Sequence, residues 1–599
     1  MAELFGMYNL KEMPLSTELF LSCSILQLTF YAISTTQQRK HGFVILSQQI
    51  YYIGVLILSL CCLLLINEDL VSLNFLSSNN FIINDYLGFA AKLVVCLTSV
   101  LFLMLITTSY EDKTIQNNFE YTVLILISIF GLLLLCSSND LMTAYLAIEL
   151  QSIAFYIMAA FKKNSVYSIE SGLKYFVIGS LSSAFFLFGS SIIYGCVGSL
   201  NFDDIRMFFS LFPLITPYDS YDKTLIELLQ SVRLLSIILF SLPDASVETV
   251  GPALSQCIPS ISEKFNSTLA TLLLTTTAYP SLKAGILEQI LTNHVESVLS
   301  TGLHVVESSN FNVDFIYFGF IFIFLSLFIK LSLAPFHFWS LDVYEGSPNT
   351  TTVFFAVVPK IGLFVLLIRI CYASFYSNFS SDWQSYFFII AVFSIFIGSV
   401  GGLEQRKVKS LLAYSSISHT GYLLLSFSSN SLEGVSMMLY YLAIFMISSL
   451  CFWSIYLFLN LKKNYYFNKQ NKELGDLVLL RESNPLLALI LSITLFSIAG
   501  IPPIVGFLAK IGVFLEVIKS SAYLIALISI LFSVSSTFYY LRIIKILYFE
   551  NILVGRLYEN ISTKKALLIS FLALSLIVLC IDPCVIYFLF EIASLLTNF

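Results

Sequence analysis

The chain is far more apolar than a soluble protein of its length. Of its 599 residues, 57% are hydrophobic and only 11% are charged, the formal net charge is −6, and the mean hydropathy is +0.86. Soluble globular domains carry about 25% charged residues. The composition therefore excludes a soluble globular protein and indicates a polytopic membrane protein, for which we expect membrane lipids, and no nucleic acid, as partners.

Eleven cysteines are scattered along the chain. They stand singly or inside apolar stretches, as Cys61 and Cys62 do, and never in the paired spacing that holds zinc or an iron–sulfur cluster. The sequence also has no glycine-rich phosphate loop after a strand, no dinucleotide fingerprint and no HExxH motif. We therefore expect no cofactor and no catalytic metal in this chain.

Apolar segments of about 20 residues are long enough to cross a bilayer as helices. The opening MAELFGMYNLKEMPL has neither a basic region nor a small-residue cleavage site, so the first apolar segment is expected to be a retained span. The predicted fold class is an all-α polytopic membrane protein with about fourteen transmembrane helices, the longest stretches including bent or broken helix. These spans lie at roughly 17–35, 50–67, 87–109, 120–137, 139–161, 172–197, 315–336, 349–372, 384–402, 410–427, 432–460, 485–518, 521–547 and 564–590.

Basic residues predict the orientation, because positively charged loops stay on the inner side. The loops after spans 1, 3, 5, 9, 11 and 13 carry them, whereas those after spans 2, 4, 8 and 10 have none, so both termini are expected outside. The basic loop residues are Arg39, Lys40, Lys113, Lys162, Lys163, Arg406, Lys407, Lys409, Lys462, Lys463, Lys469, Lys472, Arg481, Arg542, Lys545, Arg556, Lys564 and Lys565.

Residues 201–313 interrupt this pattern. They hold eleven acidic and five basic residues, with frequent Ser, Thr and Pro. Segments 225–240 and 281–299 have amphipathic spacing, which is typical of surface helices. We expect a polar acidic insertion on the outer face; an added span is the alternative, but 225–240 is short for crossing a bilayer.

Five ionisable residues interrupt long apolar runs: Glu149, Lys330, Lys360, His419 and Lys510. A charged side chain at bilayer depth costs about 2.5–3.5 kcal/mol, so such residues usually serve a function. Glu149, the one acid at the centre of a span, is the natural counter-ion for one of these lysines. A neighbouring carboxylate can switch a desolvated lysine between holding and releasing a proton, which is what proton transfer requires.

Each of these residues also has a purely structural alternative. Glu149 and a lysine can form a static pair that only fixes packing. His419, in SSISHTGY, can be hydrogen-bonded to a neighbouring Ser or Tyr. Lys174 lies only a few residues inside its span, and it can extend to the headgroups; for Lys92 this is the expected position.

Two segments have the sequence of interrupted helices. KLSLAPFHFW at 330–339 and AGIPPIVGFLAK at 499–510 both place proline near a mid-membrane lysine, and proline removes an amide donor and clashes with the preceding turn. Interrupted helices at corresponding places in two halves are typical of inverted-repeat transporters. Spans 4 to 8 and 9 to 13 would be the repeats, with discontinuous spans 7 and 12 equivalent.

Several blocks, in this order, resemble a known family: NDLMTAYLAIELQSIAFYIMAA, SGLKYFVIGSLSSAFFLFGSSIIYG, IKLSLAPFHFWSLDVYEGSPNTTTVFFAVVPKIGLF, QRKVKSLLAYSSISHTGYLL and SIAGIPPIVGFLAKIGVF. They are similar to subunit 2 of respiratory NADH:ubiquinone oxidoreductase (complex I), over about residues 85–550 except the insertion. The resemblance implies an antiporter-like membrane-arm subunit with fourteen helices, two inverted five-helix repeats and outward-facing termini.

The resemblance also implies roles for individual residues. Glu149 would be the glutamate of span 5, Lys330 the span 7 lysine paired with it, Lys360 the central lysine of span 8 and Lys510 the lysine of broken span 12. Lys174 matches a family lysine in KYFVIG. The remaining candidates for proton transfer are His419 and, within the first interrupted segment, His337.

No redox centre is implied in this subunit: flavin, iron–sulfur clusters and quinone belong to partner subunits. The expected partners are the other membrane-arm subunits, including the other antiporter-like ones. The family normally bridges the region of the insertion with a few tens of residues at most, so the insertion is read as lineage-specific. The predicted organisation is an N-terminal three-helix segment 1–119, a first repeat 120–200 and 314–372, the insertion 201–313, a second repeat 384–547 and a C-terminal helix 548–599.

The block AIELQSIAFYIMAA and the Phe/Ile/Asn-rich composition favour a mitochondrial form, multi-pass in the inner membrane, with its termini in the intermembrane space. Protons would enter near Lys360, pass His419 and reach Lys510. Two alternatives remain open: a subunit of a multi-subunit cation/proton antiporter, and a structural subunit that moves no protons.

Overall fold

The computed structural model describes residues 15–37, 46–67, 76–77, 81–109, 119–162, 165–211, 313–376, 379, 383–459, 473–478, 480–550 and 561–596. The chain divides into two compact units, one of residues 1–209 with 318–599 and one of residues 210–317. The predicted insertion lies outside the described residues from 212 to 312, as do both chain ends and many basic loop residues. Its outer-face placement and the orientation of the termini stay predictions.

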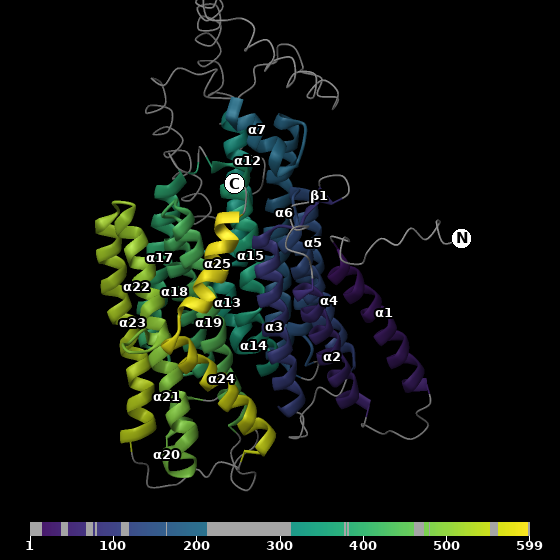
Figure 1. Cartoon of the computed structure of the whole chain (residues 1–599). Helices are drawn as coiled ribbons and strands as arrows, with labels where there is room; N and C mark the ends of the chain where they lie inside the picture. Colours follow the sequence, from purple (N-terminus) through teal and green to yellow (C-terminus); the bar gives the residue numbers. More distant parts are fainter. Residues whose placement is uncertain are drawn as a thin grey trace, which may run out of the picture. The chain divides into compact units, whose positions relative to one another are not determined.

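Apart from one hairpin whose two strands have two residues each, the described elements are all helices, as predicted (Figure 1). The elements of the first half are α1 (Ser16–Gln37), α2 (Leu46–Ile66), β1 (Leu76–Ser77), β2 (Ile82–Ile83), α3 (Tyr86–Ser109), α4 (Phe119–Ser137), α5 (Leu141–Ala159), α6 (Val166–Val197) and α7 (Phe202–Leu211). β1 and β2 pair antiparallel, with Leu76 opposite Ile83.

The second half begins after the insertion. Its elements are α12 (Val313–Lys330), α13 (Phe338–Gly346), α14 (Asn349–Val357), α15 (Pro359–Ile368), the π-helix η7 (Arg369–Ser374), α17 (Gln384–Leu403), α18 (Val408–Phe427), α19 (Leu432–Phe458), the 3-10 helix η9 (Leu474–Leu477), α20 (Leu480–Ser483), α21 (Pro485–Ala499), α22 (Val505–Lys519), α23 (Tyr523–Phe549), α24 (Thr563–Ile581) and α25 (Cys584–Leu596).

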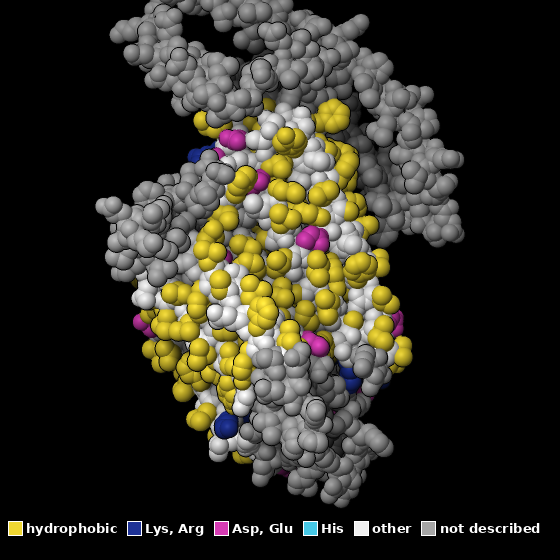
Figure 2. All heavy atoms as spheres, turned by 90° about the vertical axis from the view of Figure 1, so that its right-hand side faces the viewer, with side chains coloured by type: hydrophobic (Ala, Val, Ile, Leu, Met, Phe, Trp, Pro, Cys, Tyr) yellow, Lys and Arg dark blue, Asp and Glu magenta, His cyan; other side chains and the backbone are white. Residues whose placement is uncertain are grey.

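The predicted spans coincide with these helices. Among the described residues, eleven helices are long and apolar enough to cross a membrane, and α12, α21 and α25 are shorter apolar helices. α18 coincides with the predicted span 410–427. Figure 2 shows the consequence on the face that carries α1 and α2, where hydrophobic side chains cover most of the described surface and charges are few. The surface is built to contact lipid or other apolar protein.

Both predicted helix breaks are present. α12 ends at Lys330 and α13 begins eight residues later, while α21 ends at Ala499 and α22 begins at Val505. Each break holds a residue in the left-handed region, Ser332 with φ 56° and Gly500 with φ 76°, a conformation that ends helices. Among the long apolar helices, α4, α5 and α6 come before the first break, and α17, α18 and α19 come before the second; the inverted relation between these repeats stays a prediction.

One expectation about helix continuity was wrong. The span predicted at 564–590 is two helices, α24 and α25, because Asp582 leaves the helical region (φ −129°, ψ 84°) and Pro583 cannot donate an amide to continue the helix. The C-terminal segment 548–599 therefore contains two helices instead of one. In the predicted stretch 432–460, where we expected bent or broken helix, α19 is one uninterrupted helix of 27 residues.

The most buried helices lie at the centre of the larger unit. Every residue of α18 except Tyr414 is buried, and so is every residue from 351 to 372, in α14, α15 and η7. α18 packs extensively on α17 and also contacts α13, α19 and α22. Polar side chains on α18 can therefore meet only protein groups or enclosed water.

Lys92 does not extend to the headgroups, so the sequence expectation for it was wrong. Its side chain is 1% exposed, and Nζ lies 2.6 Å from Glu18 Oε1. Asn84 Oδ1 accepts a further, longer hydrogen bond from it. Because a buried lysine needs a compensating charge, this pair connects α1 to α3 in the N-terminal segment.

Candidate functional site

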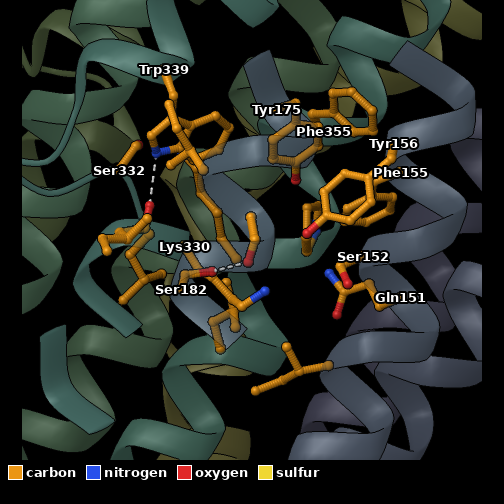
Figure 3. Close-up of a pocket in the computed structure, with 18 of the residues that line it drawn as sticks. Gln151, Ser152, Phe155, Tyr156, Tyr175, Ser182, Lys330, Ser332, Trp339 and Phe355 are labelled. Atoms are coloured by element: carbon orange, nitrogen blue, oxygen red, sulfur yellow. Dashed lines mark hydrogen bonds between the residues drawn. The ribbon is translucent and has the colours of Figure 1, made fainter. Parts of the chain in front are cut away.

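A cavity of about 50 Å³ lies between α5, α6, the break after α12, and α15. Figure 3 shows Lys330 bordering this cavity together with Gln151 and Ser152 of α5. Lys360 and Tyr175 also line it. One water needs about 10–15 Å³ of such space and two to four polar partners, so the cavity has room for a few waters beside two lysines.

The helix break places Lys330 at the cavity. Lys330 is the last residue of α12, and the indole of Trp339 donates to Ile329 O at 2.8 Å across the break (Figure 3). The same carbonyl also accepts the backbone amide of Ser332 at 3.1 Å, so the indole adds a second hydrogen bond at the end of the helix. The hydrogen bond from Trp339 therefore fixes the two sides of the break to each other, while the Lys330 side chain faces the cavity.

Glu149 and Lys330 interact electrostatically, but they do not form an ion pair within the described part of the chain. Glu149 Oε1 is buried without a hydrogen-bond partner there, and Oε2 accepts only a long bond of 3.4 Å from Ser152 Oγ. The predicted direct pairing of Glu149 with Lys330 is thus not formed in this structure.

Lys360 follows Pro359 at the start of α15 and is 6% exposed. Its Nζ has no hydrogen-bond partner among the described residues and lies 4.6 Å from the centroid of the Phe445 ring. A cation over an aromatic face gains about 2 kcal/mol when desolvated. Lys360 therefore contacts an aromatic ring on one side and borders the cavity on the other.

His419 occupies the middle of α18 and is 3% exposed. Its Nδ1 lies 2.6 Å from Tyr441 Oη, and its Nε2 lies 3.3 Å from Tyr540 Oη. Both ring nitrogens thus meet a hydroxyl that can donate or accept. Lys360 and Lys510 both interact electrostatically with His419, so the histidine is within the influence of both lysines.

Lys510 lies against the second break. Its Nζ donates to Ala499 O at 2.7 Å and sits 5.2 Å from the centroid of the Tyr422 ring. Ala499 ends α21, so its carbonyl is one that the break leaves without a helical partner. Lys510 and the break stabilise each other.

These observations bring together four of the predicted residues in the order Lys330, Lys360, His419 and Lys510. Sequence reasoning missed the aromatic groups between them, above all Tyr441, Tyr540 and Phe445. Aromatic residues are common in apolar helices, and no sequence signal separates these three from ordinary core residues.

Two other candidates lie apart from this line. Lys174 is 44% exposed and forms ion pairs with Glu170 at 2.9 Å and with Asp342 of α13 at 2.8 Å. His337 is buried at the start of α13, with Nδ1 3.2 Å from Pro335 O. Neither lines the cavity. In the part of the chain that the structure describes, no group of three or more potential metal ligands occurs.

Comparison with known proteins places this arrangement in a family. Residues 138–243 and 254–536 match the family model described as NADH:quinone oxidoreductase/Mrp antiporter, TM. NADH-ubiquinone oxidoreductase chain 2 of Marchantia polymorpha is 32% identical over 558 residues, 93% of each chain. The chain belongs to this family. NADH-quinone oxidoreductase subunit N of Pelagibacter ubique (strain HTCC1062), another member, is 31% identical over 89% of this chain and 88% of its own length.

Two solved structures have the same fold as this chain. A chain of respiratory complex I from Thermus thermophilus superposes with a TM-score of 0.65 at 19% identity, covering 95% of this chain and 98% of its own. A chain of the Mrp complex from Dietzia sp. DQ12-45-1b gives 0.68 at 15% identity, with 98% of each chain covered. The antiporter-like architecture expected from the sequence is confirmed.

Proposed function

We propose that this family member is a proton-translocating membrane-arm subunit of mitochondrial NADH:ubiquinone oxidoreductase, with no redox centre of its own. Two relatives that cover most of the chain are named NADH-ubiquinone oxidoreductase chain 2 and NADH-quinone oxidoreductase subunit N. Its partners are the other membrane-arm subunits, among them antiporter-like ones, and the lipids of the inner membrane. Flavin, iron–sulfur clusters and quinone are in partner subunits.

The observation that carries the proposal is the line of ionisable groups in the enclosed centre of the larger unit. Lys330 and Lys360 share a cavity with room for water, and His419 has a hydroxyl at each ring nitrogen. Moving one charge against about 150 mV costs roughly 3.5 kcal/mol. Bringing Glu149 and Lys330 from separation into a desolvated pair can change the free energy by an amount of that order.

In the proposed order, a proton reaches Lys360, passes His419 and arrives at Lys510, while the distance between Glu149 and Lys330 switches. His419 can take a proton at one ring nitrogen and release one from the other, because each nitrogen already has an oxygen partner. Redox energy released in the partner subunits sets the charge state along this line.

Paired substitutions at Lys510 test the proposal. Lys510→Met keeps the length of the side chain and removes the titratable group, whereas Lys510→Arg keeps the charge but releases no proton at accessible pH. If Lys510 transfers protons, both variants lower the number of protons pumped per electron in assembled enzyme. An Arg variant that pumps at the normal ratio would contradict the role.

The competing functions make different predictions. The fold shared with the Mrp chain is the reason to consider a cation/proton antiporter subunit. Such a subunit would not co-purify with flavin and iron–sulfur subunits. A structural subunit would keep the normal proton-to-electron ratio after Lys360 and Lys510 are neutralised. Fractionation of mitochondria against other membranes tests the location.

A further inference from the structure

Lys409 is a buried charged group that the proposed line leaves unused. It is the second residue of α18 and is 2% exposed. Its Nζ donates to Ser347 O at 2.8 Å, and no carboxylate forms an ion pair with it within the described residues. Glu345 and Lys162 act on it only at longer range. A buried ammonium without a paired anion is costly, so its presence calls for an explanation.

Lys409 lies in a row of polar contacts between α13 and α18. At the exposed end, Lys407 forms an ion pair with Glu345, both side chains being more than a third exposed. Lys409 follows, bonded to Ser347. The row therefore starts at the protein surface at Lys407 and is fully buried two residues later, at Lys409.

The same row continues inward through a pair of hydroxyls. Tyr344 of α13 is 4% exposed, and its hydroxyl neighbours Ser416 of α18. Ser416 is seven residues after Lys409, and positions seven apart lie on one face of a helix. His419 is three residues further on the same face. One face of α18 thus carries Lys409, Ser416 and His419.

A second cavity, of about 20 Å³, opens at this point. Its polar lining is Ser415, Ser416 and Ser449, and Phe445 closes one side. One water needs about 10–15 Å³ and at least two polar partners, so the cavity suits a single water. Phe445 is also the ring beneath Lys360 Nζ, and Tyr344 lines the larger cavity that holds Lys330 and Lys360.

We infer that the contact between α13 and α18 is the proton uptake path of this subunit, with Lys409 as its proton-transfer residue and the serine-lined cavity as its water site. The inference rests on the proposed function and names the route by which a proton reaches Lys360. An N–H bond of the Lys409 ammonium breaks; because Lys409 does not itself line the cavity, the proton passes to the cavity water by way of water in the contact between α13 and α18. The water releases a proton through the hydroxyls of Ser416 and Tyr344 to the Lys360 amine. Lys409 regains a proton from water at the surface.

The test measures protons pumped per electron, and the amount of assembled enzyme, in four variants. Lys409→Met and Lys409→Arg address the lysine. Ser449→Val removes a hydroxyl and fills the cavity. Ser454→Ala is the matched control, because Ser454 is a buried serine of the same helix that bonds only Cys451 O and lines neither cavity.

The expected result is a lower proton-to-electron ratio in Lys409→Met, Lys409→Arg and Ser449→Val at normal assembly, with Ser454→Ala unchanged. Loss of a positioned proton-transfer group slows transfer about 10²–10⁴-fold, so turnover under coupled conditions falls as well. A normal ratio in Lys409→Met overturns the inference. So does rescue by Lys409→Arg, which keeps the bond to Ser347 O and would reveal a structural role. If the lysine variants fail to assemble, a normal ratio in Ser449→Val overturns it.

Lys360→Met, measured alongside, separates this inference from the proposed function. If Lys360→Met pumps normally, the proposed function itself fails. If Lys360→Met loses pumping while Lys409→Met and Ser449→Val keep it, only the uptake path is wrong.

Discussion

Gly500→Ala tests how the second helix break holds Lys510. Gly500 has φ 76°, and a Cβ added there would lie 2.6 Å from Lys510 Cδ and 3.3 Å from its Nζ. A non-glycine residue in the left-handed region costs about 1–2 kcal/mol. The contact can be relieved only by moving the Lys510 side chain, which removes its bond to Ala499 O at 2.7 Å.

A hydrogen bond from a charged group is worth about 1.5–3 kcal/mol, so both effects together reach about 2.5–5 kcal/mol. We expect less assembled enzyme, a lower temperature of thermal inactivation, and a lower proton-to-electron ratio in what assembles. Gly195→Ala is the control, because Gly195 lies within α6 with nothing within 4 Å of the added Cβ. It should be neutral or stabilise by up to about 1 kcal/mol.

A double-mutant cycle separates the contact from the backbone strain. In a Lys510→Ala background the added Cβ meets no long side chain. Gly500→Ala should then cost only the free energy of placing alanine in the left-handed conformation, about 1–2 kcal/mol. Equal effects of Gly500→Ala in both backgrounds, or an effect as small as that of Gly195→Ala, would refute the packing of Lys510 against the break.

Three further predictions concern other charged groups. Replacing Glu149 or Lys330 alone should lower activity more than replacing both with apolar residues of matched size, whereas additive losses in assembled enzyme would argue against their coupling. Removing one partner of the buried Glu18–Lys92 pair should cost about 3–5 kcal/mol, and replacing both with apolar residues much less, as measured by thermal stability. Burial raises the pKa of Asp140, so its charged form destabilises the fold as pH rises; Asp140→Asn should raise thermal stability at pH 7, by an amount that shrinks as the medium is acidified toward the usual aspartate pKa of about 3.9.

The positions of the helices and of the buried lysines could be predicted because each depends on a local signal. Lys330, Lys360 and Lys510 interrupt long apolar runs, and the prolines near two of them indicate the breaks. The distance between Glu149 and Lys330 depends on how α5 and α12 pack, and no local pattern encodes that. The resemblance supplied the pairing, and in the structure Glu149 Oε1 has no hydrogen-bond partner among the described residues.

Other features were missed for different reasons. The partner of Lys92 is 74 positions earlier in the chain, so only packing could reveal it. The end of α24 had a local signal, Asp582 followed by Pro583, which a continuous apolar pattern on both sides concealed. Lys409 lies next to a loop rich in basic residues, where a lysine is expected to be solvated, and its burial follows from the docking of α13 on α18.

The burial of α18 has a consequence for how the chain is made. This helix carries five serines, a threonine, a histidine and a lysine among its 20 residues. A helix with so many polar residues inserts poorly into lipid when it is alone. A helix with no lipid-facing side does not need to be stable in lipid alone once its neighbours are present. α18 therefore depends on α17 and α19 during biosynthesis, and it should leave the translocation machinery together with them and not as a separate helix. A ribosome that stalls before α19 emerges would leave α18 unable to stay in the bilayer.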